Sequence, residues 1–439
     1  MVGSPSCELS SSLPFTALRQ PRPVRPTGVR VSLRQPLSAG LALCLAMVFA
    51  FSPGAKAQSG SNFWPMPSQI SADSWLLIDL STGQTLASLN ENQPMHPGGL
   101  TALMTAYLTF VALRDRVIRL EQTIPSPPEA EIPPGPRIFL GAQGASVKEL
   151  LEGVLVLAAH DAGLALARAI SGSEAGFVGL MNQTAQRLGM RQTVFVNASG
   201  AFHIDTRSSA RDLAILASTL FQDFPDALTY SSRREISFNG IRQTNPNRLL
   251  WLDRSVDGLM ATDLPGRSSA LVAAKRPQPL GTQEQVQRRM MVVISQAETP
   301  EKRVQDAQRL LNFGYQQFDL IRLYRQNEVS AAIRVYKGAT DSLNTEFRQD
   351  VLVAIPRNQQ GGIRSELQHP QGVVAPIVAN QPVGELRVWF GSRQIHSVSL
   401  VAAESVRPAG LLGRAIDSLV LWWKSLGLSP SAQATGPSS

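Results

Sequence analysis

The stretch Pro97-Gly98-Gly99-Leu100-Thr101-Ala102-Leu103-Met104-Thr105-Ala106-Tyr107 joins a proline and two glycines to an apolar run. Proline followed by glycine is typical of a sharp turn. The apolar spacing that begins near Leu100 predicts a helix extending to about Arg116. This stretch therefore predicts a tight turn that leads directly into a helix.

The patterns around this stretch predict one α+β domain over residues 73–318. Alternating or continuous apolar runs predict strands at 74–80, 85–89, 235–238, 270–274 and 290–294. Periods of 3.6 predict helices that begin at Ser146, where Glu149 completes a capping box, and at 161–170, 174–188, 206–221 and 303–318. Six prolines in 125–136 predict a loop. Because strands enclose a helical middle, we expect a sheet closed by the two terminal segments.

The character of the sequence changes after Asp319. Period-two apolar runs separated by turns predict a small β-sandwich-like domain over 319–407. Residues 408–428 then predict an amphipathic helix, whose tryptophan pair and apolar face over 411–427 favour a position in a membrane interface. A helix packed on a partner or on its own domain has the same pattern. The Ser/Pro/Ala-rich tail, 429–439, predicts disorder.

The first 57 residues have the composition of a secretory signal peptide. Arginines precede the apolar run Leu37 to Phe51, and Ala55-Lys56-Ala57 offers a cleavage site. The alternative is a membrane anchor that is never cut, although the run is short for a span. Residues 58–72 follow as a polar linker.

Most of the basic charge and both cysteines lie in this leader. Six basic residues and one acidic residue in 1–57 account for +5 of the formal net charge of +8, which leaves +3 for 58–439. The remaining chain lacks the basic excess typical of a nucleic-acid partner. Without Cys7 and Cys44 it has no disulfide or cysteine nucleophile. The five histidines show no ligand spacing, so we expect no metal and no cofactor.

A series of different short motifs follows along the chain, each at its own position. They are Leu103-Met104-Thr105-Ala106-Tyr107, Arg137-Ile138-Phe139-Leu140, Ser146 through Val156, His160-Asp161-Ala162, Met181-Asn182, Arg187-Leu188-Gly189-Met190, Ser209-Ala210-Arg211-Asp212, Phe238-Asn239-Gly240-Ile241-Arg242 and Ser255-Val256-Asp257-Gly258-Leu259. This set resembles the serine D-alanyl-D-alanine carboxypeptidases, or low-molecular-weight penicillin-binding proteins. The resemblance covers most of the mature chain. It implies the β-lactamase/penicillin-binding-protein-like fold, a β-domain and a terminal helix on the outer face of the cytoplasmic membrane.

The resemblance also implies an enzyme that removes the terminal D-alanine of peptidoglycan stem peptides through a serine acyl-enzyme. Its three catalytic motifs are all altered here. Ser-x-x-Lys falls on Gly99 and Ala102, Ser-x-Asn on Ala158-Ala159-His160, and Lys-Thr-Gly on Met260-Ala261-Thr262. None of the six lysines has a serine three residues before it, and none begins Lys-Thr-Gly. We therefore expect no catalytic residue.

Several residues could still give this cleft a function. His160 suits a general base for a rebuilt site with Thr101 or Ser199, near His203, but it equally suits a polar filler. Arg289 matches a position where the family carries an arginine near the substrate carboxylate, or it is a solvated strand residue. We expect Arg289 and His160 to be the substrate-binding candidates.

The turn itself offers one more possibility, because free amides at Gly98-Gly99 before the helix could receive an anion.

Taken together, the leader and the terminal helix predict a secreted, periplasmic protein, peripheral on the membrane through 411–427. The leading hypothesis is a non-catalytic homologue that binds stem peptides ending in D-Ala-D-Ala or positions cell-wall enzymes. The alternatives are an active carboxypeptidase or related hydrolase with substitute residues, and a structural envelope protein with a collapsed cleft.

Overall fold

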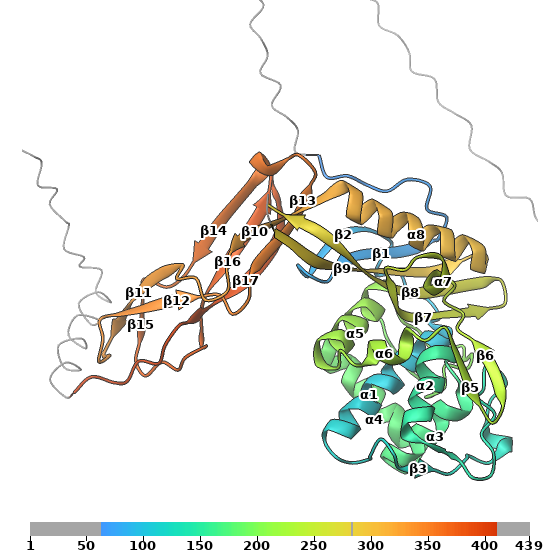
Figure 1. The fold of residues 1–439 in the computed structure, drawn as a ribbon. Coiled ribbons are helices and arrows are strands. Elements are labelled where there is room, and N and C mark those ends of the chain that lie inside the picture. Colours follow the sequence, from blue (N-terminus) through green and yellow to red (C-terminus); the bar gives the residue numbers. More distant parts are fainter. Residues whose placement is uncertain (1–62, 282–283, 411–439) are drawn as a thin grey trace, which may run out of the picture. The chain divides into compact units, whose positions relative to one another are not determined.

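The computed structural model describes residues 63–281 and 284–410. Its organising element is a five-stranded antiparallel sheet in the order β2-β1-β9-β8-β7 (Figure 1). The strands are β1 (Ser74–Asp79), β2 (Gln84–Leu89), β7 (Val256–Leu264), β8 (Arg267–Leu280) and β9 (Glu284–Ala297). Because β1 pairs with β9, the two ends of the domain close one sheet, which confirms the expected arrangement.

Alternate residues of this sheet enter two different apolar cores, as the period of two in a strand requires. The residues that join the helical core are Leu76, Leu259, Leu271, Met291 and Val293. Those that join the core under the last helix are Trp75, Leu77, Val272, Val292 and Ile294. The sheet is therefore covered on both faces.

The helices of this domain are η1 (Gly98–Thr101), α1 (Ala102–Arg114), α2 (Val147–Leu157), α3 (His160–Ser171), α4 (Glu174–Leu188), α5 (Ala210–Asp223), α6 (Ala227–Ser231), α7 (Leu249–Leu252) and α8 (Pro300–Gln317). The predicted capping box at Ser146 and Glu149 is present. The prediction for 206–221 was wrong at its start, because Ser209 caps α5 by accepting a hydrogen bond from Asp212 N. The preceding Ser208 instead bridges to Met95.

Two small sheets and a long loop complete this domain. The sheets pair β3 (Thr123–Ile124) with β4 (Ala145–Ser146), and β5 (Glu235–Phe238) with β6 (Ile241–Thr244). The proline-rich segment 125–136 is a loop, as predicted, with one 3-10 turn, η2 (Glu129–Glu131). This loop matters because it reaches the functional site.

The C-terminal domain is built only of strands and one short 3-10 turn, η3 (Gln360–Gly362), which confirms the all-β prediction. β10 (Phe318–Tyr324) pairs with β13 (Val351–Pro356), and a second sheet has the order β14-β16-β17-β12-β11-β15. The strands of the second sheet are β11 (Ala331–Tyr336), β12 (Ser342–Glu346), β14 (Ile363–Gln368), β15 (Gly372–Val374), β16 (Pro382–Phe390) and β17 (Arg393–Ala402).

The membrane predictions fall largely outside the described residues. The signal peptide, 1–57, the helix over 411–427 and the tail, 429–439, all lie there. Within 63–281 and 284–410, no helix has the length and apolar character needed to cross a membrane.

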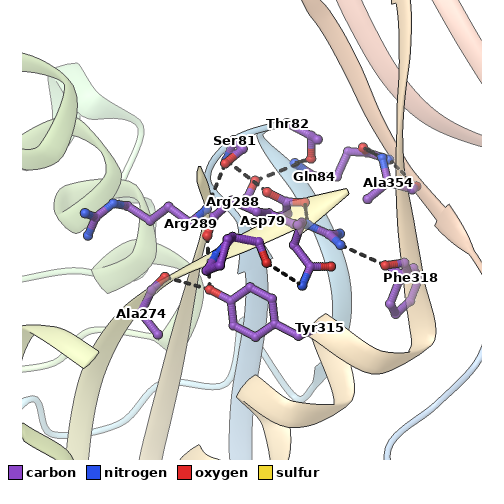
Figure 2. Close-up of polar contacts among 12 residues, drawn as sticks. Asp79, Ser81, Thr82, Gln84, Ala274, Arg288, Arg289, Tyr315, Phe318 and Ala354 are labelled. Atoms are coloured by element: carbon purple, nitrogen blue, oxygen red, sulfur yellow. Dashed lines mark hydrogen bonds and ion pairs between the residues drawn. The ribbon is translucent and has the colours of Figure 1, made fainter. Parts of the chain in front are cut away.

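A buried ion pair ties β1 to β9 (Figure 2). The side chains of Asp79 and Arg288 are both 0% exposed, and Arg288 Nε donates to Asp79 Oδ2 at 2.8 Å. Arg288 Nη1 donates to the carbonyl of Phe318 at 2.8 Å, and Asp79 Oδ1 accepts from Ser81 N at 2.9 Å. Burial raises the pKa of Asp79, and Arg288 opposes that shift. Since charges removed from water need partners, each of these two residues depends on the other.

Two further polar side chains lie near the Asp79–Arg288 ion pair in Figure 2. Tyr315 on α8 donates to the carbonyl of Ala274 at 2.8 Å. The Gln84 carboxamide accepts from Ala354 N at 2.6 Å and donates to Ala354 O at 3.1 Å. These bonds link β2, β8, α8 and β13 around the ion pair.

Candidate functional site

The three segments to which the resemblance assigns the catalytic motifs meet at one point of the structure. Gly99 in η1 donates its backbone N–H to Thr262 Oγ1 on β7 at 3.1 Å. A Cβ placed on Gly99 would lie 2.8 Å from the Cβ of Ala158 and 2.7 Å from Thr262 Oγ1. The structure thus brings together Gly99, Ala158 and Thr262, one residue from each motif.

Ala158 is positioned by a sharp break between α2 and α3. It ends α2 in the left-handed conformation, with φ of 54°, and α3 begins at His160. A non-glycine residue adopts this conformation at a cost of about 1–2 kcal/mol. Its amide is satisfied by Val154 O. This backbone hydrogen bond stabilises the break between the two helices, and the Ala158 side chain, a methyl group, adds no hydrogen bond of its own.

Two of the motif positions lie in the core. Ala102 is 2% exposed and Met260 is 1% exposed, and both belong to the apolar cluster between the helices and the sheet. Neither is among the residues that line the neighbouring cavity. The positions that the resemblance assigns to the two lysines therefore contribute packing here.

A cavity of about 290 Å³ lies beside the meeting point, lined among others by Gly99, His160, Ala261 and Thr262. Prolines, glycines and apolar residues make up most of its wall, and Asp263 is the one charged residue among the described residues that line it. Thr262 also lines a second, mostly apolar cavity of about 490 Å³. The described residues that line the cavity of about 290 Å³ include neither lysine nor arginine, whereas Arg267 lines the second cavity and pairs with Asp73.

His160 is held under the proline-rich loop. It is 5% exposed, its backbone N donates to Pro136 O at 2.7 Å, and its Nδ1 lies 3.4 Å from Pro133 O. A Cβ on Gly135, whose φ is +141°, would lie only 2.2 Å from the imidazole Cε1. The loop can therefore lie on the ring only because residue 135 is glycine.

Burial lowers the pKa of His160, which favours the neutral ring at pH 7. A neutral ring that donates Nδ1–H to Pro133 O has Nε2 left as an acceptor. This arrangement supports the interpretation of His160 as a buried polar filler at the cavity wall.

Comparisons with known proteins agree with this architecture. Residues 61–274 match the family described as D-alanyl-D-alanine carboxypeptidase, and 318–408 match the domain described as penicillin-binding protein 5, C-terminal domain. The D-alanyl-D-alanine carboxypeptidase DacC of Escherichia coli (strain K12) is 31% identical over 393 residues, which span 87% of this chain and 95% of that protein. The chain belongs to the D-alanyl-D-alanine carboxypeptidase family.

Further relatives share the full two-domain layout of this family. The carboxypeptidase DacA of Haemophilus influenzae is 29% identical over 87% of this chain and 97% of its own length. The crystal structure of penicillin-binding protein 5 from Haemophilus influenzae superposes with a TM-score of 0.69 at 28% identity, covering 78% of this chain and 99% of that one. The fold expected from the resemblance is thus confirmed.

The hydroxyl and imidazole candidates for a rebuilt family site are not brought together. Thr101 is fully buried, and its Oγ1 has no hydrogen-bond partner in the part of the chain that the structure describes. Ser199 is 1% exposed, and its Oγ donates to Asn197 Oδ1 at 3.3 Å. Neither residue, nor His203, lines the cavity that His160 lines. The Thr262 hydroxyl does line this cavity. The sequence indicates for residue 262 only that threonine stands where the family motif has glycine.

The anion site expected at the glycine turn is absent, because both amides have internal partners. Gly98 N donates to His96 Nδ1 at 3.0 Å, and Gly99 N donates to Thr262 Oγ1. The prediction of free amides at Gly98-Gly99 was therefore wrong.

Arg289 lies elsewhere on the sheet. Both its Nη atoms donate to the carboxylate of Asp257 at 2.7 Å, and it pairs with Lys275 in the β8–β9 ladder. Thr262 pairs with Ser269, six residues from Lys275 along β8, or roughly 20 Å in a strand. The geometry gives Arg289 a structural ion pair in place of the expected contact with a substrate.

An arginine that does reach the cavity wall is Arg303 on α8. Its side chain is 2% exposed, and Nη1 donates to the carbonyl of Thr262 at 3.2 Å. Sequence reasoning missed this residue. The available signal was its position on the buried face of α8, four and seven residues before Ala307 and Leu310.

Lowering the pH should destabilise the protein through His160. Its folded-state pKa lies below the usual 6.5, so the unfolded chain binds a proton first as the pH falls. Stability present above pH 6.5 is then lost toward the folded-state pKa, by at most about 1.4 kcal/mol per pH unit for one proton. Urea unfolding at pH 7.5 and 5.5 should show a smaller loss for His160→Gln than for wild type. The exposed His369→Gln variant is the control, and equal losses in all three proteins would contradict the assignment.

Proposed function

We propose that this chain is a non-catalytic member of the carboxypeptidase family, acting in peptidoglycan metabolism as a peptide binder or a scaffold for cell-wall enzymes. One observation carries the proposal: where Gly99, Ala158 and Thr262 meet, no side chain within residues 63–281 and 284–410 pairs a nucleophile with an amine. Acyl transfer through a serine needs a nearby base to remove its proton. Ala102 and Met260 supply only apolar packing at those positions.

We also propose a location for this activity. The leader, 1–57, is typical of a secreted protein, and the amphipathic pattern over 411–427 is typical of a helix on a membrane surface. The protein would thus act in the periplasm, on the outer face of the cytoplasmic membrane. The open cavity favours a binding role over a purely structural one.

A second candidate is a hydrolase with substitute residues. It is favoured by one observation, that the Thr262 hydroxyl and the His160 ring line the same cavity. Against it, Thr262 Oγ1 already accepts the Gly99 amide, and the His160 Nδ1 faces Pro133 O. A base would need to contact the hydroxyl that it activates.

Incubation of residues 58–439 with a fluorescent penicillin, and separately with a peptide ending in D-Ala-D-Ala, tests the proposal. We expect no covalent label and no D-alanine above the blank, because the site offers no activated nucleophile. The Escherichia coli carboxypeptidase DacC serves as the positive control. Labelling or D-alanine release that disappears in Thr262→Val would establish the substitute-residue hydrolase instead.

A further inference from the structure

A buried guanidinium lies directly behind the cavity wall. Besides Thr262 O, Arg303 contacts Asp263 Oδ1 at 2.6 Å through Nη1 and Pro246 O at 3.0 Å through Nη2. Thr262, Asp263 and Pro246 all line the cavity. Arg303 therefore binds three residues of the cavity wall.

Asp263 is the partner that carries the opposite charge. Its side chain is 46% exposed, so the carboxylate that binds Arg303 also remains accessible to solvent, and Asp263 is one of the residues that line the cavity. Ser268 Oγ, which is itself bonded by Arg303 Nη1 at 2.8 Å, donates to the same Asp263 oxygen. Burial lowers the pKa of Arg303, and Asp263 opposes that shift.

We propose that Asp263 acts as an internal carboxylate that occupies Arg303, so that the cavity selects neutral or cationic peptide ends and rejects a free terminal carboxylate. The inference rests on the proposed binding function and changes its ligand class, from stem peptides that end in the free carboxylate of D-Ala-D-Ala to peptides whose ends are neutral or cationic. It makes Asp263 the residue that determines specificity at this site.

The charges and donors of the wall support this selection. A ligand carboxylate in this cavity would approach Asp263 and meet no lysine or arginine among the described residues that line it. Arg267 lines the second cavity, where Asp73 already pairs with it. The Gly99 amide, which could otherwise donate to an anion, is already bonded to Thr262. A terminal amide or amine, in contrast, can donate to Asp263, and charge-assisted bonds of that kind are strong.

Calorimetric titration with acetyl-D-Ala-D-Ala and with its C-terminal amide tests this selection. We expect wild-type residues 58–439 to bind the amide at least about tenfold more tightly than the free acid, a difference typical of one repulsive or lost charge contact. Equal binding of the two probes, tighter binding of the acid, or no binding of either would overturn the proposal. None of these results would indicate catalysis, which the penicillin assay measures separately.

Asp263→Asn should reverse the preference, because it leaves Arg303 without its carboxylate while keeping one acceptor oxygen. The matched control is Asp257→Asn, which removes the carboxylate from Arg289 on the same sheet and should leave the preference unchanged. An unaltered acid-to-amide ratio in Asp263→Asn would overturn the assignment. If that variant does not fold, the ratio of acid to amide affinity of the wild-type protein is measured at low and at high salt instead. Salt screens charges, so a preference based on charge should become smaller at high salt. A ratio that does not change with salt would contradict the role of Asp263.

Discussion

Asp79→Ala should lower the free energy of unfolding by about 3–5 kcal/mol. Among the described residues, the variant leaves the buried Arg288 side chain with the carbonyl of Phe318 as its partner and with no counter-ion in direct contact (Figure 2). Its Nη2 already lacks a hydrogen-bond partner among the described residues, so no local group is placed to compensate. Urea unfolding followed by circular dichroism measures the loss.

Two controls separate the buried charge from the loss of a side chain. Replacing both partners, as Asp79→Leu with Arg288→Met, should recover most of the stability, since an apolar pair of similar volume is often neutral or stabilising. Asp73→Ala removes the exposed carboxylate that pairs with Arg267 and should cost only about 0–1 kcal/mol. If the double variant were as unstable as Asp79→Ala, an uncompensated arginine would not be the cause.

Gly99→Ser should destabilise the protein by about 1–3 kcal/mol without creating a reactive serine. The new Cβ would lie within 2.8 Å of both Ala158 and Thr262, which is closer than side chains pack. Because Ala102 places no amine beside it, the hydroxyl would keep its proton. Denaturant unfolding and fluorescent penicillin labelling measure the two effects.

Thr262→Gly should relieve part of this cost, because it removes the nearest atoms that the new side chain meets. In the double-mutant cycle we expect Gly99→Ser and Thr262→Gly to couple favourably by about 0.5–3 kcal/mol. Gly179→Ser, at a helical glycine with open space around its Cβ, is the steric control. Additive costs would show that residues 99 and 262 do not contact as described.

The sequence predicted most where periodicity and local chemistry decide the structure. The capping box at Ser146 formed as expected, and so did β1, β2, β8 and β9 of the central sheet, because their signals lie in neighbouring residues. The fifth strand, β7, was not among the predicted strands. The helix start near Thr206 failed because Ser208 pairs with the distant Met95. Contacts over such distances leave no local pattern.

The functional site likewise combines features that local sequence predicts with features that only distant contacts determine. Gly99, Ala158 and Thr262, which the resemblance assigns to three separate motifs, lie next to one another in the structure. Sequence could not show that the turn amides are already bonded, nor that Arg303 reaches the cleft wall and Arg289 does not. Both facts depend on strand register and on which polar atoms meet after folding, and neither is visible in residue type.

The burial of Ala102 and Met260 also limits how this chain could change. Catalytic sites usually hold polar or strained groups that reduce stability, so that activity and folding compete. In this chain the same two positions contribute to folding. A single substitution to lysine at either position would bury a charge without a partner and so destabilise the fold. If the proposed non-catalytic function holds, the need to fold therefore opposes any single substitution that would place a catalytic amine there.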